Sequence, residues 1–142
     1  NQTVTNNATP QNDTELFTTL VANGFYIVEL HLLYSGNDTT GDYTPNFIYP
    51  AATDQVIGTA LFPDGTFVGV WQTISQSIGQ WPTAIVIGCD LAANVRTALL
   101  SFQIRVGAAG GTLQYRFCNA TAGLGRDSIT AAGTVLRIKR LA

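Results

Sequence analysis

The chain has 142 residues, which is enough for one domain with a substantial hydrophobic core. Hydrophobic residues make up 46% of the sequence, which excludes a disordered chain, and charged residues make up only 11%, against about 25% in an average globular protein. The net charge of −2 gives no reason to expect binding to nucleic acid or to an anionic membrane, and no apolar run approaches the ~18 residues of a transmembrane helix. So few charges favour self-association or docking on a larger surface.

The charges are divided unevenly along the chain. Residues 1–90 contain eight of the nine acidic residues and no Lys or Arg, whereas residues 91–142 contain all seven basic residues. The strands run on without a linker, so two domains of opposite sign are not expected. Either strands that are distant in sequence pair acid to base within one sheet, or the two signs meet between protomers.

Residues 1–12, NQTVTNNATPQN, contain Val4 as their only large apolar side chain. They cannot form a core of their own, and they are predicted to be an extended N-terminal arm. Such a segment either frays or becomes ordered by lying on a neighbouring molecule. The chain contains no Met and begins with Asn1, so Asn1 is not expected to be a translational start.

The next segment, residues 13–36, carries the clearest structural pattern. It is predicted to form a central hairpin with a turn at residues 22–24, because Asn23-Gly24 tolerates the positive φ of hairpin turns. In the second strand an apolar face alternates with a more polar one that carries Glu29 and His31. The apolar face consists of Tyr26, Val28, Leu30, Leu32 and Tyr34.

Short apolar segments separated by turn residues continue to residue 88. They predict an edge strand interrupted by Pro45, a hairpin around Pro63-Asp64-Gly65, a polar loop or single helical turn, and a strand that is covered on both faces. These four elements are expected at residues 43–50, 56–71, 73–80 and 83–88, respectively.

Alternation becomes clear from Val95 onward, in three further strands. Arg105, Arg116 and Arg137 are predicted to point away from the core, each on a different strand. The predicted inward side chains are Leu100, Phe102, Ile104, Val106, Leu113, Tyr115, Phe117, Leu136 and Ile138. Eight or nine short strands with regular turns predict an all-β protein, an antiparallel β-sandwich of jelly-roll type that spans residues 13–142 behind the arm.

The sequence contains no recognisable catalytic constellation, and neither an enzyme, a cofactor nor a metal site is predicted. His31 is the only histidine, and its place two residues from Glu29 favours a packed or interfacial side chain over a general base. Most acidic residues lie at predicted turns or strand ends, which does not suit the paired carboxylates of a glycosidase. Cys89 and Cys118 could form one disulfide but are interpreted as reduced thiols.

The charged side chains instead predict pairing between strands or subunits. In a jelly roll the strand at residues 25–36 and the last strand are neighbours in one sheet, so their outward side chains should lie together. We therefore predict that Glu29 pairs with at least one arginine, within a protomer or across the axis of an oligomer. The residues predicted for this surface are Glu29, His31, Arg105, Arg116 and Arg137.

Two stretches of the chain resemble small β-sandwich modules in virion proteins of tailed bacteriophages. One is DTELFTTLVANGFYIVELHLLYSG at residues 13–36, and the other is GTVLRIKR at residues 133–140. The resemblance covers about residues 13–142, and it is a pattern of strands and turns rather than a chemical signature. The matching residues are Asp13, Glu15, Leu16, Ala22, Asn23, Tyr26, Glu29, Leu32, Tyr34, Ser35, Gly36, Gly133, Thr134, Leu136, Arg137, Ile138 and Arg140.

The resemblance implies a homotrimeric capsid decoration or cement protein that bridges capsomers by binding the major capsid protein. Its place would be the outer capsid surface of a virion that is assembled in the host bacterial cytoplasm. We expect the arm to contribute to this binding, and its candidate capsid contacts are Thr3, Val4, Thr5, Asn6 and Asn7.

The alternative is a tail-fibre or spike domain that binds a receptor or a carbohydrate. Sandwich domains of this kind often hold sugars against exposed aromatic rings. The candidate rings, each of which also suits packing in the core or at its rim, are Trp71, Trp81, Tyr43 and Tyr49.

Overall fold

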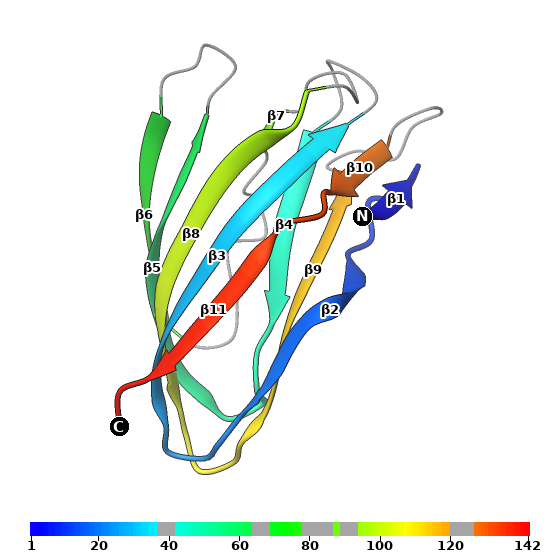
Figure 1. Ribbon diagram of the computed structural model, residues 1–142. Helices are drawn as coiled ribbons and strands as arrows, with labels where there is room; N and C mark the ends of the chain where they lie inside the picture. The colour runs from blue at the N-terminus through cyan, green and yellow to red at the C-terminus, as the bar shows by residue number, and fades with distance from the viewer. Residues whose placement is uncertain (37–41, 64–68, 78–86, 89–93, 120–126) are drawn as a thin grey trace.

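The computed structural model describes residues 1–36, 42–63, 69–77, 87–88, 94–119 and 127–142. In these ranges the chain forms eleven β-strands and no helix, arranged as two antiparallel sheets that pack against each other (Figure 1). The predicted all-β class and the packing of two antiparallel sheets are confirmed.

Sheet A has seven strands, in the order β1-β10-β3-β8-β5-β6, with β11 paired to β3 on the same edge as β10. Sheet B has four strands, in the order β2-β9-β4-β7. The bounds in sheet A are β1 Gln2–Thr5, β3 Phe25–Gly36, β5 Thr53–Pro63, β6 Gly69–Ser77, β8 Arg96–Val106, β10 Asp127–Thr130 and β11 Val135–Arg140. The bounds in sheet B are β2 Gln11–Leu20, β4 Asp42–Ile48, β7 Ile87–Gly88 and β9 Gly111–Asn119.

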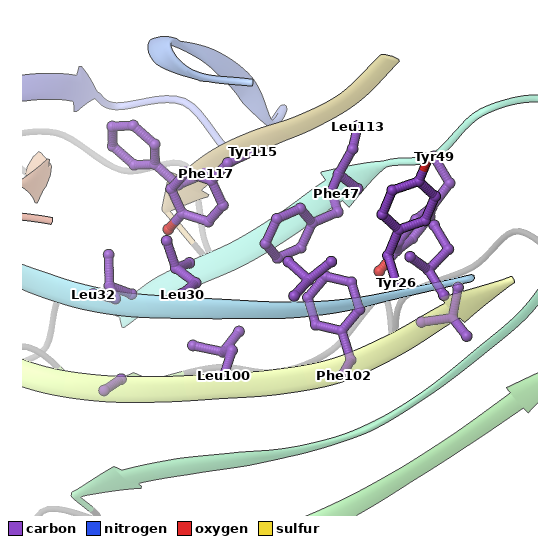
Figure 2. Packing of buried hydrophobic residues seen from close by; sticks show 14 of the residues in the cluster. Tyr26, Leu30, Leu32, Phe47, Tyr49, Leu100, Phe102, Leu113, Tyr115 and Phe117 are labelled. Carbon is purple, nitrogen blue, oxygen red and sulfur yellow. The ribbon is translucent and has the colours of Figure 1, made fainter. Parts of the chain in front are cut away.

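The core lies between the sheets and uses the strand faces that alternation predicts. Aromatic rings from both sheets meet there, as Phe47 of β4 stands edge-on to Phe102 of β8 and to Tyr115 of β9 at centroid distances of 5.1 and 5.3 Å (Figure 2). Leu136 and Ile138 of β11 are only half-buried against this core. The predicted inward residues that are buried are Tyr26, Val28, Leu30, Leu32, Tyr34, Leu100, Phe102, Ile104, Val106, Leu113, Tyr115 and Phe117.

Residues 13–36 form two strands but not a hairpin. β2 pairs with β9 in sheet B, whereas β3 pairs with β8, β10 and β11 in sheet A. The positive φ is confirmed at Asn23, at 55°, but not at Gly24, whose N–H donates to the Val21 carbonyl at 3.3 Å. The chain therefore crosses from sheet B to sheet A at this turn. The predicted pairing of β3 with the last strand is confirmed.

The first twelve residues lie on the sandwich of their own chain. β1 pairs antiparallel with β10, and Val4 is 3% exposed in the core. The Asn7 carbonyl accepts a hydrogen bond from the Asn119 N–H at 3.0 Å. Val4 thus anchors a segment that is otherwise polar, which is why a count of apolar residues predicted an arm. The predicted boundary between residues 12 and 13 falls inside β2.

The middle of the chain departs from the predictions in two places. β4 is not an edge strand, because it lies between β9 and β7. Pro45 is tolerated because β7 pairs with β4 only at Asp42 and Tyr43, which leaves β9 as the described neighbour of Pro45. Residues 73–77 belong to β6 and not to a loop or a helical turn.

The predicted hairpin of β5 and β6 is confirmed by their antiparallel pairing. Its turn, residues 64–68, lies outside the described residues. The predicted strand at residues 83–88 is described only at Ile87–Gly88, which form β7.

β2 leaves its ladder with β9 in the middle of the strand, where the register shifts between Asn12 and Phe17; we call this irregular segment the bulge. Asp13 is 5% exposed, and its carboxylate accepts hydrogen bonds from the N–H groups of Glu15 and Leu16 at 2.9 and 3.0 Å. The side-chain amide of Gln114 donates to the Asp13 carbonyl at 2.8 Å. These bonds satisfy backbone groups that the bulge takes out of the ladder.

Candidate functional site: the outer face of sheet A

The structure gathers most of the residues predicted for pairing on one surface, the face of sheet A that points away from the core. We call it the outer A face, and define it by the side chains that alternate with buried ones on β11, β3, β8 and β5. They are Val135, Arg137 and Lys139 of β11; Phe25, Ile27, Glu29, His31 and Leu33 of β3; Thr97, Leu99, Ser101, Gln103 and Arg105 of β8; and Gln55, Ile57 and Leu61 of β5.

The strand register places Glu29 between Arg137 of β11 and Ser101 of β8. The described residues nevertheless contain no ion pair between Glu29 and an arginine, so the predicted pair is absent within the protomer. Arg137 is exposed, and an exposed ion pair gains at most about 1 kcal/mol, which hardly offsets the entropy of holding two long side chains. Strand periodicity predicted which residues are neighbours but not how their side chains lie.

An acid from the first half of the sequence does meet a base from the second half at one end of this face. The Arg105 Nε lies 3.9 Å from the Asp54 carboxylate, and the two side chains are 69% and 58% exposed. Such an exposed pair adds little to stability. In the described part of the chain, pairing of acid with base across one sheet is therefore seen between β5 and β8, and it is weak.

The two remaining members of the predicted set lie on different sheets. His31 lies on the outer A face between Val135 and Leu99, and it is exposed. Arg116 lies on β9 in the other sheet, where its Nε donates to the Asn46 side-chain oxygen at 2.7 Å. It therefore cannot act together with Glu29 inside one protomer.

A shallow depression of about 390 Å³ lies on the outer A face. Its lining combines the apolar side chains of Ile27 and Ile57 with the polar groups of Glu29, Ser101 and Gln103. Ile57 is 40% exposed. A broad, open surface that mixes aliphatic and polar side chains has the composition of many protein–protein interfaces.

Two of the four candidate sugar-binding rings are in the core. Tyr43 is fully buried, and Tyr49 is 9% exposed, so neither ring can stack on a ligand from outside. The side chain of Trp71 and all of Trp81 lie outside the described residues.

Sequence reasoning missed a buried polar link between the sheets. The Tyr43 hydroxyl of β4 lies 2.5 Å from the Tyr115 hydroxyl of β9 and 2.6 Å from the Thr130 hydroxyl of β10. Burial raises the pKa of both tyrosines well above the usual value of 10.0. The hydroxyls therefore stay protonated and act as structural hydrogen-bonding groups. Alternation identified Tyr115 as inward, but not that it meets a tyrosine from a different strand.

The described residues contain no group of three or more His, Cys, Asp or Glu side chains placed to hold a metal ion. Cys118 is a buried free thiol, and burial raises its pKa while the charge of Arg116 opposes the rise. Cys89 lies outside the described residues. In the part of the chain that the structure describes, no helix is long and apolar enough to cross a membrane.

Comparison with known proteins does not add a family to this description. No family model matches the chain, and neither the curated proteins nor the solved structures give a significant match.

Proposed function

We propose that this chain is a jelly-roll structural protein of a bacteriophage virion, a homotrimer that decorates the capsid and bridges capsomers. The observation that carries the proposal is the strand order. Four strands of one sheet run β2-β9-β4-β7 and four of the other run β3-β8-β5-β6. This is the order expected when eight strands fold as two Greek keys, the arrangement used by viral capsid domains and by lectins. β11 adds a further strand at the β3 edge.

The outer A face is the surface that we assign to subunit contact in the trimer. Ile57 and Val135 are 40% and 41% exposed there, and Ile27, Leu33 and Leu99 are half-buried. Burial of these side chains would remove apolar surface from water, at about 25 cal/mol per Å². Glu29, which lies opposite Arg137 without an ion pair in one protomer, would pair with an arginine across the trimer axis. A bridging trimer then binds the lattice at several equal sites, which raises its avidity.

Two measurements test this proposal. Light scattering on the purified protein should give three times the 15.1 kDa mass of one chain at micromolar concentration. Electron microscopy of virions labelled with an antibody against the chain should place the label over the capsid shell. A stable monomer in solution would count against the trimer, and label confined to the tail would replace decoration by a tail-fibre role.

The alternative function, recognition of a receptor or carbohydrate by a tail-fibre or spike domain, draws on the same strand order, because lectins share it. It loses support from Tyr43 and Tyr49, since both rings are buried. It depends on Trp71 and Trp81. Binding of the protein to immobilised host polysaccharide, lost in the Trp71→Ala and Trp81→Ala variants, would favour it over decoration.

The proposal does not require a free N-terminal arm. β1 would have to leave β10 and take Val4 out of the core before residues 3–7 could reach a capsid subunit. Capsid contact through residues 3–7 would thus require β1 to detach from the sandwich. Deletion of residues 1–7 tests it, because a folded truncated protein with unchanged occupancy on virions would exclude that contact.

A further inference from the structure

The edge of sheet A beside β3 is covered along only part of its length. β10 and β11 follow one another along this edge of β3, and β1 covers the outer side of β10 (Figure 1). β11 pairs with β3 and with no second strand among the described residues. The sheet therefore ends in an open strand that is six residues long.

The hydrogen-bonding phase of the β11–β3 ladder shows which backbone groups are open. The N–H and C=O of Phe25 both bond to the residues that follow β11, and the Leu33 carbonyl bonds to the turn that precedes it. Odd-numbered residues of β3 therefore direct their backbone groups toward β11. Because the groups alternate along an antiparallel strand, the N–H and C=O of Leu136 and Ile138 point away from β3 and are available to another strand.

A groove runs beside this edge, between β11 of sheet A and the bulged part of β2 in sheet B. Its volume is about 250 Å³, and it is lined by Glu15, Leu16, Phe17, Thr18, Leu136 and Ile138. Leu16, Leu136 and Ile138 pack against the core, so the bottom of the groove is continuous with the apolar interior. The groove offers a place for apolar side chains of an added strand.

The neighbouring β1 shows what such an added strand looks like. β1 is antiparallel to β10, and its Val4 side chain enters the core between the two sheets. The Gln2 side chain of β1 then bridges to β2, where its oxygen accepts from the Thr14 N–H at 2.9 Å. A strand on β11 would continue the same arrangement along the edge.

Charge decides what kind of strand fits. Arg137 and Lys139 project from β11 on the outer A face, and Arg140 follows them. A second copy of β11 in antiparallel pairing would bring these cations together, which disfavours self-pairing and protects the edge. A strand with acidic side chains opposite Arg137 and Lys139, and apolar side chains opposite Leu136 and Ile138, satisfies both faces.

We propose that β11 is a docking edge for an extended segment of a partner protein, in which acidic and apolar residues alternate. The segment adds as an antiparallel strand, with main-chain bonds to Leu136 and Ile138 and its apolar side chains in the groove. This inference deepens the proposed function, on which it rests, because it gives the decoration protein a specific means of holding a lattice protein.

The first test uses a synthetic peptide of roughly eight residues that alternates valine and glutamate. Titration calorimetry on the isolated protein should show saturable binding with one peptide per chain. The peptide valines should lie opposite Leu136 and Ile138, so their N–H groups face β11. N-methylation of the valines should therefore abolish binding, while N-methylation of the glutamates should leave it nearly unchanged. Equal tolerance of both methylated series would overturn strand addition.

The second test exchanges charges. The double variant Arg137→Glu, Lys139→Glu should bind the glutamate peptide at least about tenfold more weakly, and it should gain affinity for the matching valine–lysine peptide. Arg105→Glu is the matched control for the single variant Arg137→Glu, because each reverses one charge on the outer A face, and Arg105 lies on β8, away from the edge. An equal loss in the control would reduce the effect to net charge and overturn the assignment to β11.

The alternative to a partner segment at the β11 edge is a second copy of this chain. If another protomer filled the edge, amide hydrogen exchange at Leu136 and Ile138 would slow as protein concentration rose without peptide, and that result would overturn the partner proposal. The peptide experiment does not involve virions. Absence of peptide binding with label on the shell would refute only the docking edge, whereas peptide binding with no label on virions would refute only the decoration role.

Discussion

At the scale of single residues, the buried tyrosines Tyr43 and Tyr49, which flank Phe47 in the sequence, differ in one respect that can be measured. The Tyr43 hydroxyl joins Tyr115 and Thr130 across the sheets, whereas the buried Tyr49 hydroxyl has no hydrogen-bond partner among the described residues. Tyr43→Phe should lower the free energy of unfolding by about 1–3 kcal/mol, because it leaves buried hydroxyls without their partner. Urea denaturation monitored by circular dichroism measures this.

Tyr49→Phe is the matched control for that variant. It removes the same atom from the same core but breaks no hydrogen bond, so it should be neutral or slightly stabilising. Equal destabilisation by the two substitutions would show that the Tyr43 hydroxyl contributes through packing alone.

Buried tyrosines also make stability depend on alkaline pH. Burial raises the pKa of Tyr43, Tyr49 and Tyr115 above the 10.0 of an exposed tyrosine, so above pH 10 the unfolded chain loses protons that the folded chain keeps. Stability is full below the unfolded pKa and falls as pH rises toward the folded pKa, by about 1.4 kcal/mol per pH unit for each such tyrosine. Urea midpoints should therefore drop between about pH 10 and about pH 11. Constant midpoints, with tyrosinate absorbance appearing in the folded state, would contradict the burial of these rings.

At the scale of the strands, the contact of β5 with β8 depends on a residue without a side chain. A Cβ added to Gly58 would meet the Cβ of Phe102 and the Ser101 carbonyl more closely than real Cβ atoms approach. Gly58→Ala should therefore separate the strands and cost about 1–3 kcal/mol or more, as overpacking does. Ala98→Gly on β8 is a useful comparison, because it removes a buried methyl group without adding a clash. A fully stable Gly58→Ala protein would show that the two strands can move apart freely.

The strands also show what sequence reasoning can reach. The buried faces of β3, β8 and β9 were predictable because a strand with one covered face must alternate, and the period is fixed by backbone geometry. The partition of β2 and β3 into different sheets was not predictable, since the turn at Asn23 fits a hairpin and a sheet crossing equally well. β1 was missed because Val4 alone gives no periodicity. On the outer A face, periodicity predicted that Glu29 and Arg137 are neighbours, but the described residues of one protomer contain no ion pair between them.

At the scale of the whole molecule, the proposed trimer rests on the apolar part of the outer A face. Ile57→Asp places a charge on a side chain that is exposed in the protomer but buried in the proposed contact. The monomer should keep its stability, because an exposed substitution seldom changes it by more than about 0.5 kcal/mol. The trimer should dissociate, because an unpaired charge would be buried. Light scattering and urea denaturation on the same samples separate the two effects.

The control for this variant is Thr112→Asp, which introduces the same charge at an exposed position of β9 in the other sheet. It should leave the trimer intact. A trimer that survives Ile57→Asp, or dissociates equally with Thr112→Asp, would move the subunit contact away from the outer A face.

The pairing of the first strand with one of the last has a consequence for how the chain reaches its fold. Gln2 lies opposite Thr130, and β3 is completed by β11, so neither edge can form until nearly all of the sequence has left the ribosome. Contacts of such long sequence separation make folding slow, on the order of milliseconds to seconds. Until the C-terminal residues arrive, β3 presents a bare apolar strand edge to every other nascent copy. A chain shortened before Val135 should therefore aggregate during synthesis, even though most of its core residues are present.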